Sequence, residues 1–201
     1  MTDAESYLAA AGIEPVTVRL MEEMGYFTQP ASKSHHLACP GGLAQHSANV
    51  TRRLVELTKS LDVRWTREQA PYLVGMLHDL VKCKCYRAMG EMERNLPPKY
   101  EYVQPEYPGH GACSVAIATE LGIQLMREEI AAIAFHMGPW GVGKEYADKE
   151  LDAALKAYGP QIIATHTADW WACCVDERED GARRHGGHRG PPPTIQGGMS
   201  K

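Results

Sequence analysis

The segment 74–83, VGMLHDLVKC, places three ionisable side chains in an apolar stretch: His78, Asp79 and Lys82. Burying such groups costs free energy unless they are paired or bind a metal ion. On a helix, Lys82 follows the His-Asp pair at a spacing that puts it on the same side, within reach of the same ligand. Gly75 precedes the pair by one turn, and we expect it to leave room beside both side chains. The segment therefore predicts a buried polar site.

Further polar residues fall within or next to other apolar helical patterns, namely His46, His110, His136 and Asp169. Together with the His-Asp pair, they would direct nitrogen and oxygen ligands from several helices to a common interior. A lone histidine on an apolar face is more often a hydrogen-bonded core residue than a ligand, and we keep that interpretation for His35 and His166. Residue types and spacing alone leave both interpretations of the larger set open.

The motifs GGLAQHS, LHDLVK, GHGACSV, AFHMG and HTADWW follow one another along residues 34–177. They present their polar residues in the order His, His-Asp, His, His, Asp. This ordered set resembles the HD-domain phosphohydrolase superfamily in its six-ligand, two-metal form. The resemblance implies an all-α fold, an HD-domain-like helical bundle with a buried metal site.

The resemblance also implies which residues of this chain hold metal. The ligands implied for a first ion are His46, His78, Asp79 and Asp169. Asp79 would bridge to a second ion, which His110 and His136 would complete. Nitrogen and carboxylate ligands suit Fe, Mn, Ni, Co or Zn, and we expect two such divalent transition-metal ions.

The implied reaction is hydrolysis of a phosphoester or phosphoanhydride in a nucleotide-type substrate by a hydroxide shared between two cations. Asp79 would be the catalytic bridging carboxylate. Lys82 would bind the substrate and neutralise charge that develops on the phosphate. His36 could contribute to substrate binding at the entrance, although an exposed loop histidine explains it equally well. Trp170 and Trp171 are interpreted as core or interface residues.

Helices must position these residues, and the chain has helical patterns along most of its length. The expected helices cover residues 2–12, 14–25, 43–61, 66–83, 112–122, 127–138 and 160–177, with a further short helix before residue 159. Thr66 is the expected N-cap of the helix that carries the His-Asp pair. Residues 86–109, rich in Pro, Gly and Tyr, predict a long loop or a small hairpin.

The chain divides into three expected parts. Residues 1–30 form N-terminal helices packed on the core, 31–180 form the HD phosphohydrolase domain, and 181–201 form a disordered tail because that segment has nothing to bury. Specificity is expected to depend on 86–109 and on 138–148. Within the latter segment, Trp140 and Lys144 are interpreted as structural residues.

Composition excludes several classes of protein. The formal net charge of −4 gives no electrostatic case for general nucleic-acid binding. No apolar run approaches the roughly 20 residues that span a bilayer, and the N-terminus lacks the features of a signal peptide. We therefore expect a cytoplasmic protein without a membrane partner. The six cysteines lack a C-x-x-C pair and are expected to be reduced thiols, mostly filling the core.

Two alternative functions stay open. One is a nuclease that acts on nucleic-acid ends, but the chain has no room for a separate binding domain and lacks a basic surface interleaved with aromatic residues. The other is a non-catalytic HD-like module that senses ligands. Such modules typically lose metal ligands, whereas all six positions are filled here. The favoured partner is a small nucleotide-type molecule, with nucleic acid second, and no oligomeric state is predicted.

Overall fold

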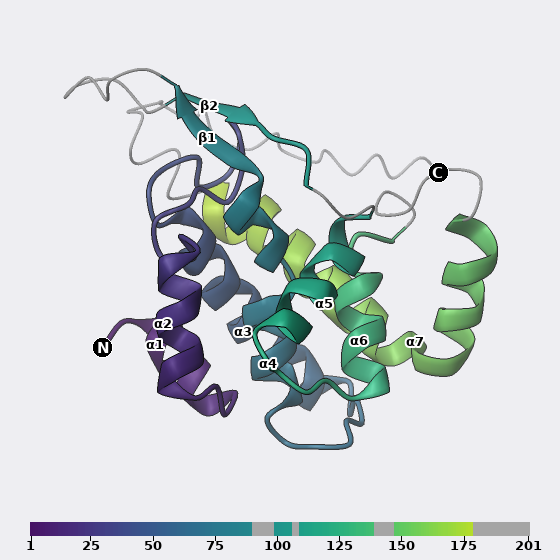
Figure 1. The fold of residues 1–201 in the computed structure, drawn as a ribbon. Helices are drawn as coiled ribbons and strands as arrows, with labels where there is room; N and C mark the ends of the chain where they lie inside the picture. The colour runs from purple at the N-terminus through teal and green to yellow at the C-terminus, as the bar shows by residue number, and fades with distance from the viewer. Residues whose placement is uncertain (90–98, 106–108, 139–146, 179–201) are drawn as a thin grey trace, which may run out of the picture.

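Helices form most of the described chain, as the sequence predicts (Figure 1). The computed structural model describes residues 1–89, 99–105, 109–138 and 147–178. Its α-helices are α1 (Asp3–Ala10), α2 (Pro15–Glu23), α3 (Gly42–Ser60), α4 (Ala70–Leu77), α5 (His110–Glu120), α6 (Arg127–Ala134) and α7 (Ala147–Trp171). A 3₁₀-helix, η1 (Leu80–Lys84), follows α4, and a π-helical turn, η3 (Ala172–Asp176), follows α7.

Helix α3 packs against both α4 and α7. Its buried face carries Val50 and Leu54, at the helical spacing seen in the sequence. Gly75 of α4 meets this face so closely that an added Cβ would lie 2.6 Å from the Cα atom of Thr51 and collide with its hydroxyl. The expectation that Gly75 makes room for the His-Asp pair is therefore wrong, because the missing side chain admits α3 instead.

A second close approach joins α5 to the end of α6. A Cβ added to Gly111 would collide with the carbonyl oxygens of Ile133 and Ala134, so only glycine allows these backbones to meet. His110 immediately precedes this glycine and His136 lies just beyond α6. The contact thereby holds two polar residues of distant segments side by side.

Helix α4 is shorter than the predicted helix 66–83. It begins at Ala70, and Pro71 occupies its first turn, where a missing N–H is tolerated. Thr66 is not its N-cap, since its backbone N–H donates to Glu128 Oε1 at 3.0 Å. The α-helix ends at Leu77, and Asp79 has φ −109° and ψ 22°. The His-Asp pair therefore lies at the junction between α4 and η1.

Helix α7 is kinked. Tyr158 has φ −138° and ψ 29°, two residues before Pro160. Proline removes a helical hydrogen bond and its ring collides with the preceding turn, so the helix bends here. The two separate helical patterns in the sequence lie on either side of this bend. In Figure 1 the part after the kink runs behind α5 and α6, and α7 packs against α3 and α6.

The segment 86–109 contains a small hairpin, one of its two expected forms. Strands β1 (Tyr86–Met89) and β2 (Lys99–Tyr102) are antiparallel, with Tyr86 opposite Tyr102. The predicted tail 181–201, together with Trp140 and Lys144, lies outside the described residues.

The N-terminal segment contacts the same core. Helix α1 packs on α3 and α4, and the buried Tyr26 hydroxyl donates to the carbonyl oxygen of Met76 at 2.6 Å.

Cys83, Cys85 and Cys113 are buried, and all six cysteines are thiols.

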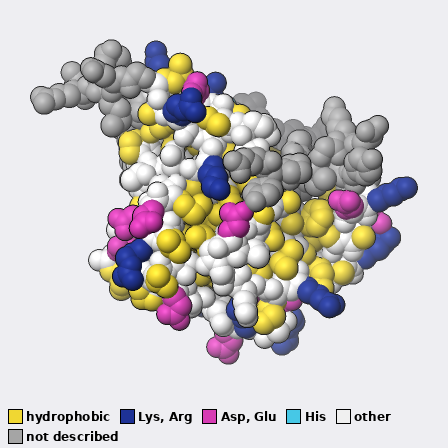
Figure 2. All heavy atoms as spheres, in the orientation of Figure 1, with side chains coloured by type: hydrophobic (Ala, Val, Ile, Leu, Met, Phe, Trp, Pro, Cys, Tyr) yellow, Lys and Arg dark blue, Asp and Glu magenta, His cyan; other side chains and the backbone are white. Residues whose placement is uncertain are grey.

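The surface carries mixed charge. On the face drawn in Figure 2, acidic and basic side chains are interspersed, and no histidine of the described residues is visible. Trp170 and Trp171 are about half exposed, so the interpretation of these two residues as core residues is wrong. Arg53 lies over the Trp171 ring, 5.6 Å from its centroid. None of the described helices combines the length and apolar character required to cross a bilayer.

Candidate metal centre

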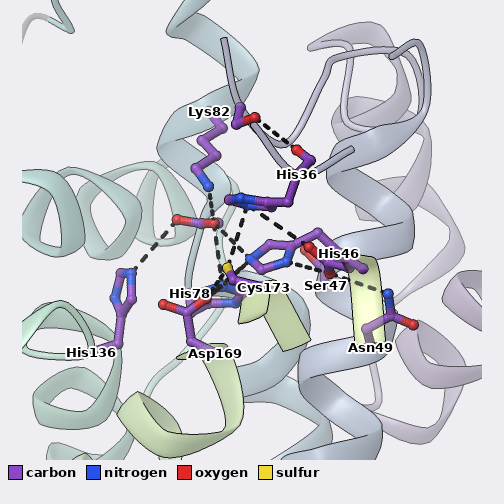
Figure 3. A network of polar contacts seen from close by, with 12 residues as sticks. His36, His46, Ser47, Asn49, His78, Lys82, His136, Asp169 and Cys173 are labelled. Atoms are coloured by element: carbon purple, nitrogen blue, oxygen red, sulfur yellow. Dashed lines mark hydrogen bonds and ion pairs between the residues drawn. The ribbon is translucent and has the colours of Figure 1, made fainter. Parts of the chain in front are cut away.

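Four of the predicted site residues converge from α3, from the junction after α4 and from α7 (Figure 3). His46 Nε2 lies 3.3 Å from Asp79 Oδ2 and 3.2 Å from Asp169 Oδ1. His78 Nε2 lies 3.3 Å from the same Asp79 oxygen and 3.9 Å from Asp169 Oδ1. The two Nε2 atoms are 3.3 Å apart. Four ligand-type atoms thus surround one small volume.

The other two predicted residues face the opposite oxygen of Asp79. His110 Nε2 lies 2.5 Å from Asp79 Oδ1, and His136 Nε2 lies 3.6 Å from it. Asp79 therefore presents Oδ2 to one pair of histidines and Oδ1 to another. The structure brings all six predicted residues together, with this carboxylate between the two groups.

Hydrogen bonds on the outer side of the rings assign their tautomers. His78 and His136 each have Nδ1 against the backbone carbonyl three residues earlier, at 2.8 Å and 2.7 Å. His46 Nδ1 lies 2.8 Å from Glu177 Oε1. A carbonyl or carboxylate oxygen only accepts, so each Nδ1 carries the proton. In the neutral ring, Nε2 then directs a lone pair inward.

This arrangement fits a metal ion. The Nε2 atoms of His46 and His78 lie 3.3 Å apart, and either a proton or a metal cation between them removes the repulsion of their lone pairs. His136 Nε2 is buried and has no hydrogen-bond partner among the described residues. Mixed imidazole and carboxylate ligands are typical of Zn, Fe and related transition metals. These buried histidines and aspartates could therefore hold metal, with His46, His78 and Asp169 as one group and His78, Asp79 and His136 as another.

The electrostatics of the cluster favour cations. Burial opposes charge on the His46 ring, but the carboxylates of Glu177, Asp169 and Asp79 outweigh it and raise the pKa of His46 well above its usual value. Burial likewise opposes the ionised form of Asp79, yet the Lys82 ammonium and the neighbouring histidines hold its pKa well below the usual range. Each carboxylate is ionised because positive or donor groups surround it.

Lys82 contacts this centre directly. Its Nζ lies 2.6 Å from Asp79 Oδ2, and its side chain is 12% exposed. The predicted proximity to Asp79 is present, but a 3₁₀ turn provides it instead of a continuous α-helix. Burial opposes the charged ammonium, and the carboxylates of Asp79 and Asp169 outweigh it and raise the pKa of Lys82.

Burial distinguishes the floor of the site from its mouth. The side chains of His46, His78 and His136 are fully buried. Those of His36 and His110 are 19% and 25% exposed. Solvent therefore reaches the centre at these two histidines, at Lys82 and at Asp169, whose side chains are partly exposed.

His36 is closer to the centre than an exposed loop histidine would be. Its ring centroid is 5.0 Å from that of His46. Burial, with the positive charges of His46 and Lys82, lowers its pKa to about 4. His36 therefore lies beside the centre and is partly exposed, and its role in substrate binding stays a prediction.

His166 and His35 stay outside the cluster, as expected. His166 Nδ1 lies 2.6 Å from the His136 carbonyl oxygen, and His35 is exposed in a loop. The sequence interpretation missed Glu177, the buried partner of the His46 ring. Its spacing from Asp169 and Cys173, four residues at each step, was the available signal because such residues share a helix face.

Comparisons of this chain with models of protein families, with curated proteins and with solved structures give no match. The side chains described above and the order of the sequence motifs are therefore what indicates the function of this protein.

Proposed function

We propose that this protein is a metal-dependent phosphohydrolase with an HD-domain-like fold, which cleaves a phosphoester or phosphoanhydride bond of a nucleotide-type substrate. The observation that carries the proposal is the two-sided presentation of Asp79. One oxygen faces His46 and His78, and the other faces His110 and His136. A carboxylate placed in this way suits two neighbouring cations.

His46, His78, Asp79 and Asp169 would hold one cation, and Asp79, His110 and His136 would hold the other. When bound, two such cations supply a water of lowered pKa and stabilise charge on a phosphoryl group. The protein's own contribution is orientation. The hydrogen bonds at Nδ1 fix the rings, and burial excludes bulk water from the floor of the site.

The mouth of the site supports an anionic substrate. The partly exposed side chains of the centre are those of Lys82, His36, His110 and Asp169. The first three bear nitrogen atoms, and the Lys82 ammonium is held as a cation. A phosphate oxygen at the mouth would accept from Lys82, which stabilises charge as it develops during phosphoryl transfer.

The aromatic side chain of Tyr86, whose electrostatics Lys82 influences, supports a nucleotide-type substrate. Tyr86 begins β1 directly after η1, and its ring packs edge-on against Tyr102, with centroids 6.1 Å apart. Burial raises the pKa of Tyr86, and the nearby Lys82 ammonium opposes that shift. An aromatic face next to a phosphate-binding lysine offers a base a stacking surface.

The test measures metal content and phosphate release together on single variants. Asp79→Ala should lose both metals and all activity, because its two oxygens serve both groups of ligands. His46→Ala should mainly lose the first metal and His136→Ala the second. His35→Ala, an exposed histidine from the neighbouring loop, is the matched control and should keep metal and activity.

The substrate panel would contain nucleoside mono-, di- and triphosphates, dinucleotides, cyclic dinucleotides and a single-stranded oligonucleotide. Turnover of the small nucleotides supports the proposal. Faster removal of terminal residues from the oligonucleotide would identify a nuclease. Metal and ligand binding without turnover would identify a sensing module, and a protein that takes up no metal contradicts the proposal altogether.

A further inference from the structure

A second group of ligand-type atoms lies beside the metal centre, on the side of His46 (Figure 3). Cys173 Sγ lies 3.5 Å from His36 Nε2, and Glu177 Oε2 lies 3.9 Å from the same nitrogen. One ligand atom from each of His36, His46, Cys173 and Glu177 can be chosen so that all four lie within 4.8 Å of one another. None of the three side chains from His36, Cys173 and Glu177 belongs to the six-ligand set.

Two separate parts of the chain build this group. Cys173 and Glu177 are four residues apart, around the π-helical turn η3, so both project from one side of the chain's last described helix. π-helical turns occur frequently at functional sites. His36 comes from the loop before α3, where its carbonyl oxygen accepts from Ser32 Oγ at 2.7 Å. This hydrogen bond orders the loop around His36 locally.

Glu177 provides an independent sign of a missing partner. Its side chain is 0% exposed. Oε1 lies 2.8 Å from His46 Nδ1 and accepts from Asn49 Nδ2 at 3.2 Å. Oε2 is buried and has no hydrogen-bond partner among the described residues. An unsatisfied, buried carboxylate oxygen is costly, and a cation between it and His36 would remove that cost.

We propose that His36, Cys173 and Glu177 form a binding site for one zinc-class ion, separate from the histidine–aspartate centre. Tetrahedral zinc, with bonds of about 2.0–2.3 Å, places its ligands about 3.3–3.6 Å apart. The observed separations of 3.5 Å and 3.9 Å are close to that spacing. The partial exposure of His36 provides an entry path and leaves a fourth position for water.

The ligand types distinguish this ion from those of the main centre. A thiolate favours Zn²⁺ and Co²⁺ over Mn²⁺ and Mg²⁺, whereas the main centre has only imidazole and carboxylate ligands. Cys173 Sγ now donates to Asp169 Oδ1 at 3.6 Å. As the metal–sulfur bond forms, the S–H bond breaks and its proton leaves to solvent. Glu177 would then connect both sites, since its other oxygen holds His46.

Cobalt substitution tests this site without relying on hydrolysis. Co²⁺ added to the chelator-treated protein should produce a thiolate-to-cobalt charge-transfer absorption in the near ultraviolet. Cys173→Ala should lose the band and about one equivalent of tightly bound metal. Cys174→Ala is the matched control, a neighbouring partly buried thiol outside the group, and should keep the band.

Circular dichroism would verify that each variant is folded, and Cys173→Ser would replace Cys173→Ala if the latter is not. Glu177→Gln and His36→Ala should weaken the band by lowering the affinity for Co²⁺. A wild-type protein without the band, or a Cys173 variant that keeps it, would overturn the proposal. The main centre offers no thiolate, so neither result bears on the phosphohydrolase proposal, which the metal-content and phosphate-release assay tests separately.

Discussion

Replacing Lys82 with methionine should destabilise the metal-free protein far more than the metal-loaded protein. Lys82 Nζ lies 2.6 Å from Asp79 Oδ2, and the two side chains are nearly buried. Methionine keeps most of the apolar stem but removes the charge. Without metal, Asp79 then loses its strongest partner. With metal bound, the cations neutralise the carboxylate and little stability should be lost.

The magnitude follows from this distance. At an effective dielectric constant of about 20, two unit charges 2.6 Å apart attract by about 6 kcal/mol. Desolvation offsets part of that attraction, and removing one partner of a buried pair typically costs about 3–5 kcal/mol. For a chain of this length, that corresponds to a fall in Tm of about 6–20 °C. Turnover of the loaded enzyme should fall on the order of 10²-fold, because a charge that stabilises the transition state is missing.

The assay is thermal unfolding with chelator and with Mn²⁺, followed by metal content and phosphate release. Lys84→Met is the control, since Lys84 lies in the same 3₁₀ turn but is exposed. It should change neither Tm nor rate. Equal destabilisation of Lys82→Met in both metal states would show that the lysine acts through packing, and an unchanged rate would refute its role toward phosphate.

Three other predictions concern the fold and its metal. Chelation should lower Tm and added metal should restore it, because a ligand at 100 times its Kd stabilises the folded state by about 2.7 kcal/mol; a Tm indifferent to both would contradict metal binding by the folded protein. Gly75→Ala should cost about 1–3 kcal/mol in urea unfolding, since its Cβ would overlap both the backbone and the side chain of Thr51. Adding Thr51→Ala should recover only part of this loss, because the backbone of residue 51 would still lie 2.6 Å from the new Cβ. Hydrogen bonds from Arg53 hold the pKa of Asp176 below its unfolded value, so this carboxylate stabilises the protein at neutral pH and loses that effect as acid protonates it. Asp176→Asn should therefore be less stable than wild type near neutral pH and equally stable in strong acid. A difference in the free energy of urea unfolding that stays the same from neutral pH to strong acid would contradict this.

Much of the helical structure could be predicted from local sequence. Apolar spacing located α3, and the two helices expected on either side of residue 159 are the two parts of the kinked helix α7. The boundary at His78 could not be predicted in this way. The segment 74–83 is apolar enough to continue as an α-helix, and the change to a 3₁₀ turn after Leu77 is visible only in the folded backbone.

The sequence by itself determined which side chains were candidates for chemistry. Residue type and position within apolar patterns marked His46, His78, Asp79 and their distant partners as candidates, and the resemblance of the ordered motifs to a known family favoured metal binding over burial in the core. Spacing within a segment also placed Lys82 beside Asp79, since neighbours one turn apart share a side.

The resemblance implied that these side chains divide around Asp79, but only the tertiary structure gives the distances and the oxygen of Asp79 that each histidine faces. That division depends on close packing between segments far apart in sequence, such as Gly111 against the end of α6, and no local pattern encodes these distances. The same is true of Glu177, which lies 131 residues after His46 yet holds its ring. A helix period fixes directions within one segment, whereas the distance between two segments is set by the side chains that fill the space between them.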